Sequence, residues 1–105
     1  MTQQWQRICA LTDIPTQGAR AVQLGDMAPI AIFRTTGDRV FALDNRCPHK
    51  GGELSHGLVY GETVACPMHN FKIDLKTGQA LAPEQGQTAC HSVEVRDGEV
   101  WLARS

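Results

Sequence analysis

The sequence predicts an all-β protein, built as a small antiparallel β-sandwich or barrel. Short apolar runs alternate with Gly, Asp, Asn and Pro, which is the pattern of strands joined by turns. No window of about eleven residues shows helical periodicity. Near the C-terminus an Asp-Gly pair separates two such runs, as in a β-hairpin. Together these three observations favour an all-β architecture.

The expected strands follow one another along the whole chain. In the first half they cover residues 5–11, 19–24, 28–34 and 39–43. In the second half they cover residues 71–75, 79–82, 92–96 and 99–103. The segment TTGD should turn the chain between the third and fourth strands. Asp97 and Gly98 should join the last two, because both residue types tolerate the positive φ angles of a type I′ turn.

Length and charge limit the function classes. The 105 residues suit a single domain, residues 1–105, and the formal charge of −1 gives no electrostatic basis for nucleic-acid or membrane partners. The N-terminal MTQQWQRIC lacks the apolar core of a signal peptide, so we expect a soluble, cytoplasmic protein. Its four cysteines should then be reduced, which favours metal ligation over disulfides.

Two Cys/His pairs are the strongest motif in the sequence. Cys47 precedes His49 by two residues, and Cys66 precedes His69 by three. Each pair falls on an expected loop, and a proline follows each cysteine and restricts the backbone. A catalytic nucleophile would need one cysteine and one base rather than two matched pairs. The pattern therefore indicates four ligands of a metal centre.

The spacing C-x-H, sixteen residues, C-x-x-H resembles the Rieske iron–sulfur motif. The resemblance implies a Rieske-like antiparallel β-sandwich with a small inserted cluster-binding subdomain, its loops at about residues 45–70. It also implies a [2Fe–2S] cluster with Cys47 and Cys66 on one iron and His49 and His69 on the other. Zinc is the competing metal, but structural zinc sites usually open with a Cys pair and close with a His pair.

The remaining cysteines, histidines and tryptophans are expected to be structural. Cys9 and Cys90 fall in strands, where each is most simply a small buried hydrophobe. His56 lies between the two Cys/His pairs and is expected to be a polar residue of a solvent-facing loop. A role beside the metal ligands stays open for it. The last histidine, His91, has no partner nearby in the sequence. Trp5 and Trp101 should pack in the sandwich or at its edge.

A Rieske centre fully ligated by protein leaves no position for a substrate, so the chain should carry single electrons and catalyse no turnover alone. High-potential Rieske proteins add a disulfide between the cluster loops and hydroxyl groups near the sulfurs. The matching positions here are Gly52, Met68, Phe71 and Ile73, none of which supplies either feature. We therefore expect a reduction potential in the lower part of the Rieske range.

CPHKGGELSHG and CPMHNFKIDLKTGQALAPEQG resemble the small subunit of cytoplasmic NAD(P)H-dependent nitrite reductase. This resemblance implies a role in nitrite reduction to ammonium and nitrate assimilation, with a large-subunit partner that carries FAD, an iron–sulfur cluster and sirohaem. The alternative is the ferredoxin component of an aromatic-ring dioxygenase system. Asn70 favours the first, because dioxygenase ferredoxins usually have glycine after the ligand histidine. A third interpretation is an assembly subunit whose cluster is incidental to turnover.

Overall fold

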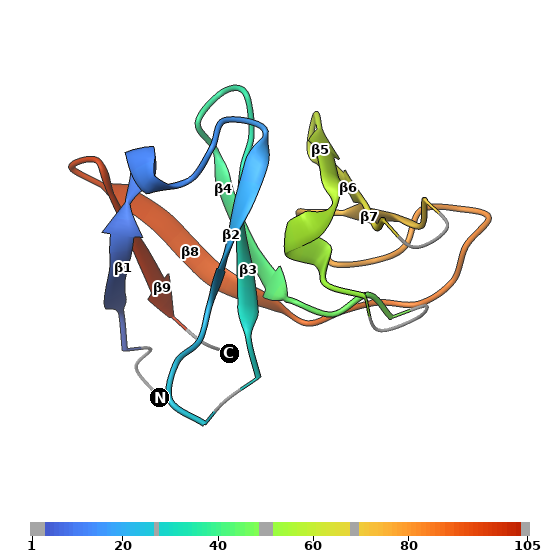
Figure 1. Ribbon diagram of the computed structural model, residues 1–105, viewed down its shortest axis with the longest axis horizontal. Coiled ribbons are helices and arrows are strands. Elements are labelled where there is room, and N and C mark those ends of the chain that lie inside the picture. The colour runs from blue at the N-terminus through green and yellow to red at the C-terminus, as the bar shows by residue number, and fades with distance from the viewer. Residues whose placement is uncertain (1–3, 27, 49–51, 68–69, 104–105) are drawn as a thin grey trace.

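The computed structural model describes residues 4–26, 28–48, 52–67 and 70–103, and within them the fold is nearly all β (Figure 1). Two antiparallel sheets make up the structure. The larger sheet contains β1 (Gln6–Ala10), β2 (Gly18–Val22), β3 (Ile30–Arg34), β4 (Val40–Asp44), β8 (Cys90–Arg96) and β9 (Glu99–Ala103). The smaller contains β5 (Leu58–Tyr60), β6 (Thr63–Ala65) and β7 (Lys72–Asp74). The predicted antiparallel β-sandwich class is confirmed.

The large sheet has the strand order β1-β9-β8-β4-β3-β2. β8 connects its two halves, because its first residues pair with β4 and its later residues pair with β9. This arrangement lets the β1-β9 half and the β4-β3-β2 half of the sheet lie on opposite sides of a shared core. In Figure 1 the small sheet lies to one side of the β2-β3-β4 half.

β3 is the central strand of the packing. Ile30 and Ile32 face one apolar cluster, which lies within the large sheet and includes Cys9, Val100 and Leu102. The alternate residues Ala31 and Phe33 face a second cluster, between the large sheet and the small one. All four side chains are fully buried, because neighbours cover both faces of the strand. This explains the unbroken apolar run IAIF in the sequence.

Both predicted hairpins are confirmed. β3 and β4 pair on either side of the TTGD turn, and Arg39 N–H closes that turn through its bond to Thr35 Oγ1 at 3.3 Å. β8 and β9 pair around Asp97 and Gly98. Their φ angles of 51° and 77° are both positive, as a type I′ turn requires.

The structure corrects three expectations about the elements. β5 and β6 were expected to be loop, and each is a strand of only three residues. The expected strand at 79–82 is instead a loop segment with isolated bridges to Ile73 and Gln87. Two short 3-10 helices, η1 (Leu11–Asp13) and η2 (Leu54–His56), were not predicted. Among the described residues, no helix is long and apolar enough to span a membrane.

Candidate metal centre

The two cysteines of the paired motif occupy equivalent positions in two closed loops. Cys47 N–H donates to the carbonyl of Gly52 at 2.7 Å, and Cys66 N–H donates to the carbonyl of Phe71 at 2.7 Å. In each loop the cysteine therefore bonds to the residue five positions later. Both loops are closed at their base by the cysteine itself, which fixes the start of each loop.

Both cysteine side chains are buried in the cluster between the two sheets. Cys47 and Cys66 are each 1% exposed, and both are free thiols. They share this cluster with Leu54, Val64 and Phe71. Two buried cysteines, one from each loop and neither in a disulfide, are suited to thiolate ligation of a shared metal centre. The residues present therefore fit the cysteine half of the expected cluster site.

The expected histidine ligands, His49 and His69, lie outside the described residues, as does Met68. The described part of the chain thus contains two of the four expected ligands. It contains no group of three or more His, Cys, Asp or Glu side chains arranged to bind a metal. By sequence, each histidine belongs to one of the two closed loops, since residues 47–52 and 66–71 enclose positions 49 and 69.

Backbone and side-chain bonds anchor the first loop on both sides. Before Cys47, Asn45 N–H donates to the Pro29 carbonyl at 2.9 Å. After it, Ser55 N–H donates to Asn45 Oδ1 at 2.8 Å. The amide side chain of Asn45, directly after β4, thus bonds to η2, which contains Ser55. Asparagine at this position holds the two ends of the loop segment together.

The second loop is the connection of a β-hairpin. Cys66 directly follows β6 and Phe71 directly precedes β7, and Ala65 pairs with Lys72 across the hairpin. Asn70 has a φ of 56°, in the left-handed region. Glycine and asparagine are the residues that adopt this conformation most readily. The choice of Asn or Gly at this position therefore follows from the turn of the backbone.

A third segment, residues 80–86, lies against both cysteine loops. Ala80 N–H donates to the Gly86 carbonyl at 2.9 Å, which closes this segment as a loop. A Cβ at Gly86, whose φ is 132°, would lie 3.4 Å from Pro48 and 4.0 Å from the Phe71 ring. The segment thus contacts a residue of each loop. Sequence reasoning did not assign it to the site, because its partners are far away in the chain.

The other two cysteines differ from each other. Cys9 is 3% exposed in β1, as predicted, and burial raises the pKa of its thiol. Cys90 is exposed, so the prediction that it is buried is wrong. It is the first residue of β8 and follows an exposed segment, so the sheet does not yet cover it. Both lie in the large sheet rather than in the cysteine loops.

The other two histidines, His56 and His91, differ in their exposure and in their partners. His56 is exposed and contacts Glu53 Oε2 at 3.1 Å, which agrees with a solvent-facing position. His91 was expected to have no partner nearby in sequence, but its Nε2 lies 2.7 Å from Asp44 Oδ1 and its side chain is only 5% exposed. The pair joins β8 to the end of β4, three residues before Cys47. Only the folded register brings the two residues together.

The two tryptophans lie at the β1 side of the large sheet, as the predicted placement in the sandwich or at its edge allows: Trp5 directly precedes the edge strand β1, and Trp101 lies in its neighbour β9. The Arg96 guanidinium stacks on both, 5.0 Å from the Trp5 ring and 5.5 Å from the Trp101 ring. These cation–π contacts connect the segment before β1 to β8 and β9. They lie in the β1-β9-β8 part of the large sheet, whereas the Cys47 loop follows β4 and the Cys66 loop follows β6.

Together the β-sandwich and the two cysteine loops define a small iron–sulfur electron-transfer domain. The chain belongs to the Rieske-like [2Fe-2S] domain family, whose model matches residues 4–103. It is 34% identical to ferredoxin CarAc of Metapseudomonas resinovorans, over 98% of this chain and 96% of that protein. It is 35% identical to the 3-phenylpropionate/cinnamic acid dioxygenase ferredoxin subunit of Photorhabdus laumondii, over 93% of this chain and 92% of that protein.

Solved structures of both kinds of redox system are similar to this one. One is a chain in the complex of reduced oxygenase and oxidized ferredoxin of carbazole 1,9a-dioxygenase, with a TM-score of 0.84, 31% identity, and coverage of 97% of this chain and 94% of that one. Another is a protein assigned as the small subunit of a NADPH nitrite reductase, with a TM-score of 0.81, 26% identity, and coverage of 94% and 97%. The chain is a Rieske [2Fe–2S] electron-transfer protein.

Proposed function

We propose that Cys47, His49, Cys66 and His69 hold the [2Fe–2S] cluster, with the cysteines on one iron and the histidines on the other. Two observations support this assignment. Cys47 and Cys66 are the buried free cysteines of the two closed loops. The other two cysteines lie in the large sheet, one of them exposed.

A Rieske cluster supplies the protein with the ability to accept and release one electron. The chain itself supplies a dry and rigid environment for the two thiolates. Leu54, Val64 and Phe71 pack with the cysteines in one apolar cluster, which excludes water from their side chains. The backbone bonds from the two cysteine amides keep the loops closed, so the ligands need little rearrangement when the charge changes.

We further propose that this protein is the ferredoxin component of an aromatic-ring dioxygenase system. The observation that carries the proposal is the identity of 34–35% to ferredoxins, one of them a dioxygenase subunit, over nearly the full length of both chains. In this function the protein takes single electrons from a flavin reductase and passes them to an oxygenase. The aromatic substrate then binds to the oxygenase and not to this chain.

Reconstitution tests the electron-carrier function. The purified holoprotein is mixed with the flavin reductase and the oxygenase encoded beside its gene, and NADH or NADPH oxidation and product formation are measured. Product should form only when all three proteins are present. If the oxygenase turns over equally well without this chain, the dioxygenase function is wrong.

Ligand variants test the cluster assignment. Cys47→Ser and Cys66→Ser should abolish the red-brown absorbance and the equimolar content of iron and sulfide. Cys9→Ser and Cys90→Ser are the matched controls and should leave both unchanged, because neither residue lies in the cysteine loops. Protein that is prepared anaerobically and contains zinc without sulfide would contradict the assignment.

The second candidate is the small subunit of a nitrite reductase. The match of 26% identity to a protein assigned that role favours it, as does the resemblance of residues 47–86. In a deletion strain, growth on nitrite as sole nitrogen source should then fail, and the wild-type gene should restore it. Rescue by Cys66→Ser as well as by wild type would leave only the assembly-subunit interpretation.

A further inference from the structure

The small sheet has one fully buried face and one outer face that is exposed on its edge strands, while Ala65 on the central strand β6 is 4% exposed. Across the sheet, Leu58 pairs with Ala65, and Ala65 pairs with Lys72. Directly paired residues project from the same face, so these three form one row. The central residues Val59, Val64 and Ile73 project from the other face, and all three are buried between the sheets. The row that begins with Leu58 therefore belongs to the outer face.

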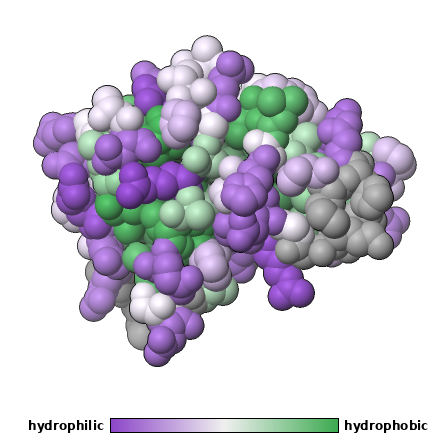
Figure 2. Space-filling model, viewed as in Figure 1, coloured by the Kyte–Doolittle hydropathy of each residue, from purple (hydrophilic) through white to green (hydrophobic). Residues whose placement is uncertain are grey.

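Three of the four exposed large apolar side chains among the described residues lie on or beside this outer face. Leu58 is 68% exposed and Tyr60, two residues further along the same strand, is 39% exposed. Leu81 is 37% exposed, and its N–H donates to the Lys72 carbonyl at 2.9 Å, which places it beside the row. Among the described residues, only one other large apolar side chain, Val95, is comparably exposed. Figure 2 shows hydrophobic surface at the upper right, over the region where Figure 1 places β5.

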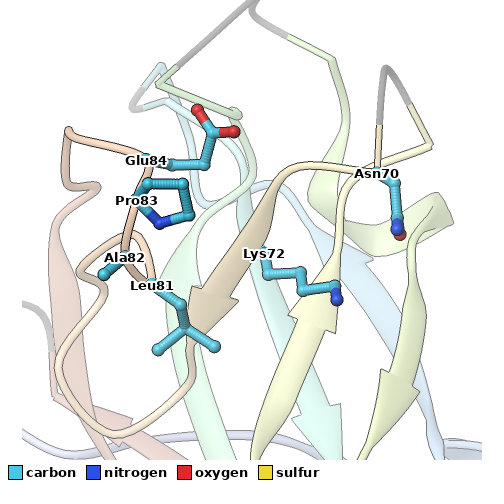
Figure 3. Close-up of a pocket in the computed structure, with 6 residues that line it drawn as sticks. All are labelled: Asn70, Lys72, Leu81, Ala82, Pro83 and Glu84. Atoms are coloured by element: carbon cyan, nitrogen blue, oxygen red, sulfur yellow. The ribbon is translucent and has the colours of Figure 1, made fainter.

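A hollow of about 200 Å³ continues this face toward the cysteine loops. Figure 3 shows the segment 81–84 on one side of it and the strand that carries Lys72 on the other. The lining residues are Asn70, Lys72, Leu81, Ala82, Pro83 and Glu84. Leu81, Ala82 and Pro83 give the hollow an apolar wall, while a lysine and a glutamate lie at its borders. Neither Lys72 nor Glu84 forms an ion pair with another described residue.

The position of the hollow relates it to the site. Asn70 belongs to the Cys66 loop, and Lys72 begins the strand directly after that loop. A protein seated on this face therefore contacts the chain within a few residues of Cys66. Electron transfer between proteins requires the partner to lie close to the cluster, and a surface that joins apolar contacts with a lysine and a glutamate that pair with no other described residue is suited to a specific, reversible partner.

We propose that the outer face of β5-β6-β7 and the hollow beside it are the docking surface for the protein that exchanges electrons with this chain. The fitting partner has a protruding apolar side chain that enters the hollow. An acidic group of the partner lies opposite Lys72, and a basic group lies opposite Glu84. This inference rests on the proposed electron-carrier function and holds for either class of redox partner.

Three charge-changing variants test the surface. Leu81→Glu places a carboxylate in the apolar wall, and Lys72→Glu reverses the charge at the border. Val95→Glu is the matched control, because Val95 is also 37% exposed but lies on β8 in the large sheet. Each variant is first checked for unchanged iron content, absorbance and reduction potential. Stopped-flow kinetics then measure electron transfer from the reduced variants to two purified acceptors, the oxygenase and the nitrite reductase large subunit of the source genome.

Both surface variants should lower the second-order rate of electron transfer by about tenfold or more, while Val95→Glu stays within about twofold of wild type. Transfer only to the nitrite reductase, with the same loss in the surface variants, would overturn the dioxygenase function and keep the docking surface. Surface variants that transfer as fast as the control would overturn the docking surface alone. A wild type that transfers to neither protein would overturn both. A dimer in sedimentation that Leu81→Glu dissociates would show that a second copy occupies the face, which also overturns the proposal.

Discussion

Gly57 is the position where a single added methyl group should disturb the site most directly. It follows η2 and lies against β6, the strand that leads into Cys66. A Cβ at this position would be 2.5 Å from the Ala65 carbonyl oxygen and 2.8 Å from Val64 Cγ2. Ordinary contact begins at 3.4 Å, so the backbone of β6 would have to move by almost 1 Å. Its backbone φ of −78° suits any residue, so the close approach alone requires glycine.

Gly57→Ala should therefore lower the free energy of unfolding by about 1–3 kcal/mol, the usual cost of forcing an extra carbon into a packed interior. For a chain of this length, that loss corresponds to a decrease in Tm of roughly 5–20 °C. Since the displaced strand ends one residue before Cys66, the variant should also bind less iron than wild type. Thermal unfolding followed by circular dichroism, together with iron analysis, measures both effects.

Gly37→Ala is the matched control for this variant. A Cβ at Gly37 would meet no atom within 4 Å, and its φ is not in the left-handed region. Its effect should be small, and a slight stabilisation is expected because alanine restricts the unfolded chain. If Gly57→Ala unfolds at the same temperature as Gly37→Ala, the packing argument is refuted.

Three other measurements test the remaining features. The reduction potential from protein-film voltammetry should lie near about −150 mV, and a value above roughly +150 mV would contradict the expected lack of hydroxyl donors. Iodoacetamide should label Cys90 much faster than Cys9, because Cys9 is buried and its pKa is raised; equal labelling by mass spectrometry would contradict this. The same pKa shift makes stability depend on pH, because the Cys9 thiol ionises at a lower pH in the unfolded chain than in the folded one. The contribution of Cys9 to stability is fully present below its ordinary pKa of 9.0 and is lost as the pH rises above that value. His91→Ala should cost about 1–3 kcal/mol in denaturant unfolding by leaving Asp44 without its ring partner, and no loss would show that the pair is dispensable.

The sequence predicted the strands of the large sheet well, because their apolar runs are long enough to show a pattern. The segment IAIFR in β3 was recognisable as a strand from its unbroken apolar run. That run is needed because neighbours cover both faces of the strand. LVY and TVA were missed because strands of three residues are too short for a period of two to be recognised. Their stability comes from packing Val59 and Val64 against the large sheet, which no local pattern reveals.

The same division applies to the site. The cysteines could be predicted because their chemistry and spacing are local properties of the chain. The pairing of His91 with Asp44 could not, since the two residues are 47 positions apart and meet only through the register of β8 on β4. The contact of Gly86 with Pro48 is likewise a product of tertiary folding. Long-range contacts of this kind shape the surroundings of the ligands.

The residue used to choose between the two redox systems shows why the partner was harder to predict than the cofactor. Asn70 distinguished the nitrite reductase resemblance from the dioxygenase ferredoxins, which usually have glycine there. Its φ of 56° means that the position selects for a left-handed backbone, which both residues provide. The difference between Asn and Gly therefore reports the shape of the loop rather than the identity of the partner. On the proposed docking surface, partner choice depends instead on exposed side chains such as Leu81 and Lys72. Their pattern is not tied to the fold, so binding and electron-transfer experiments have to establish it.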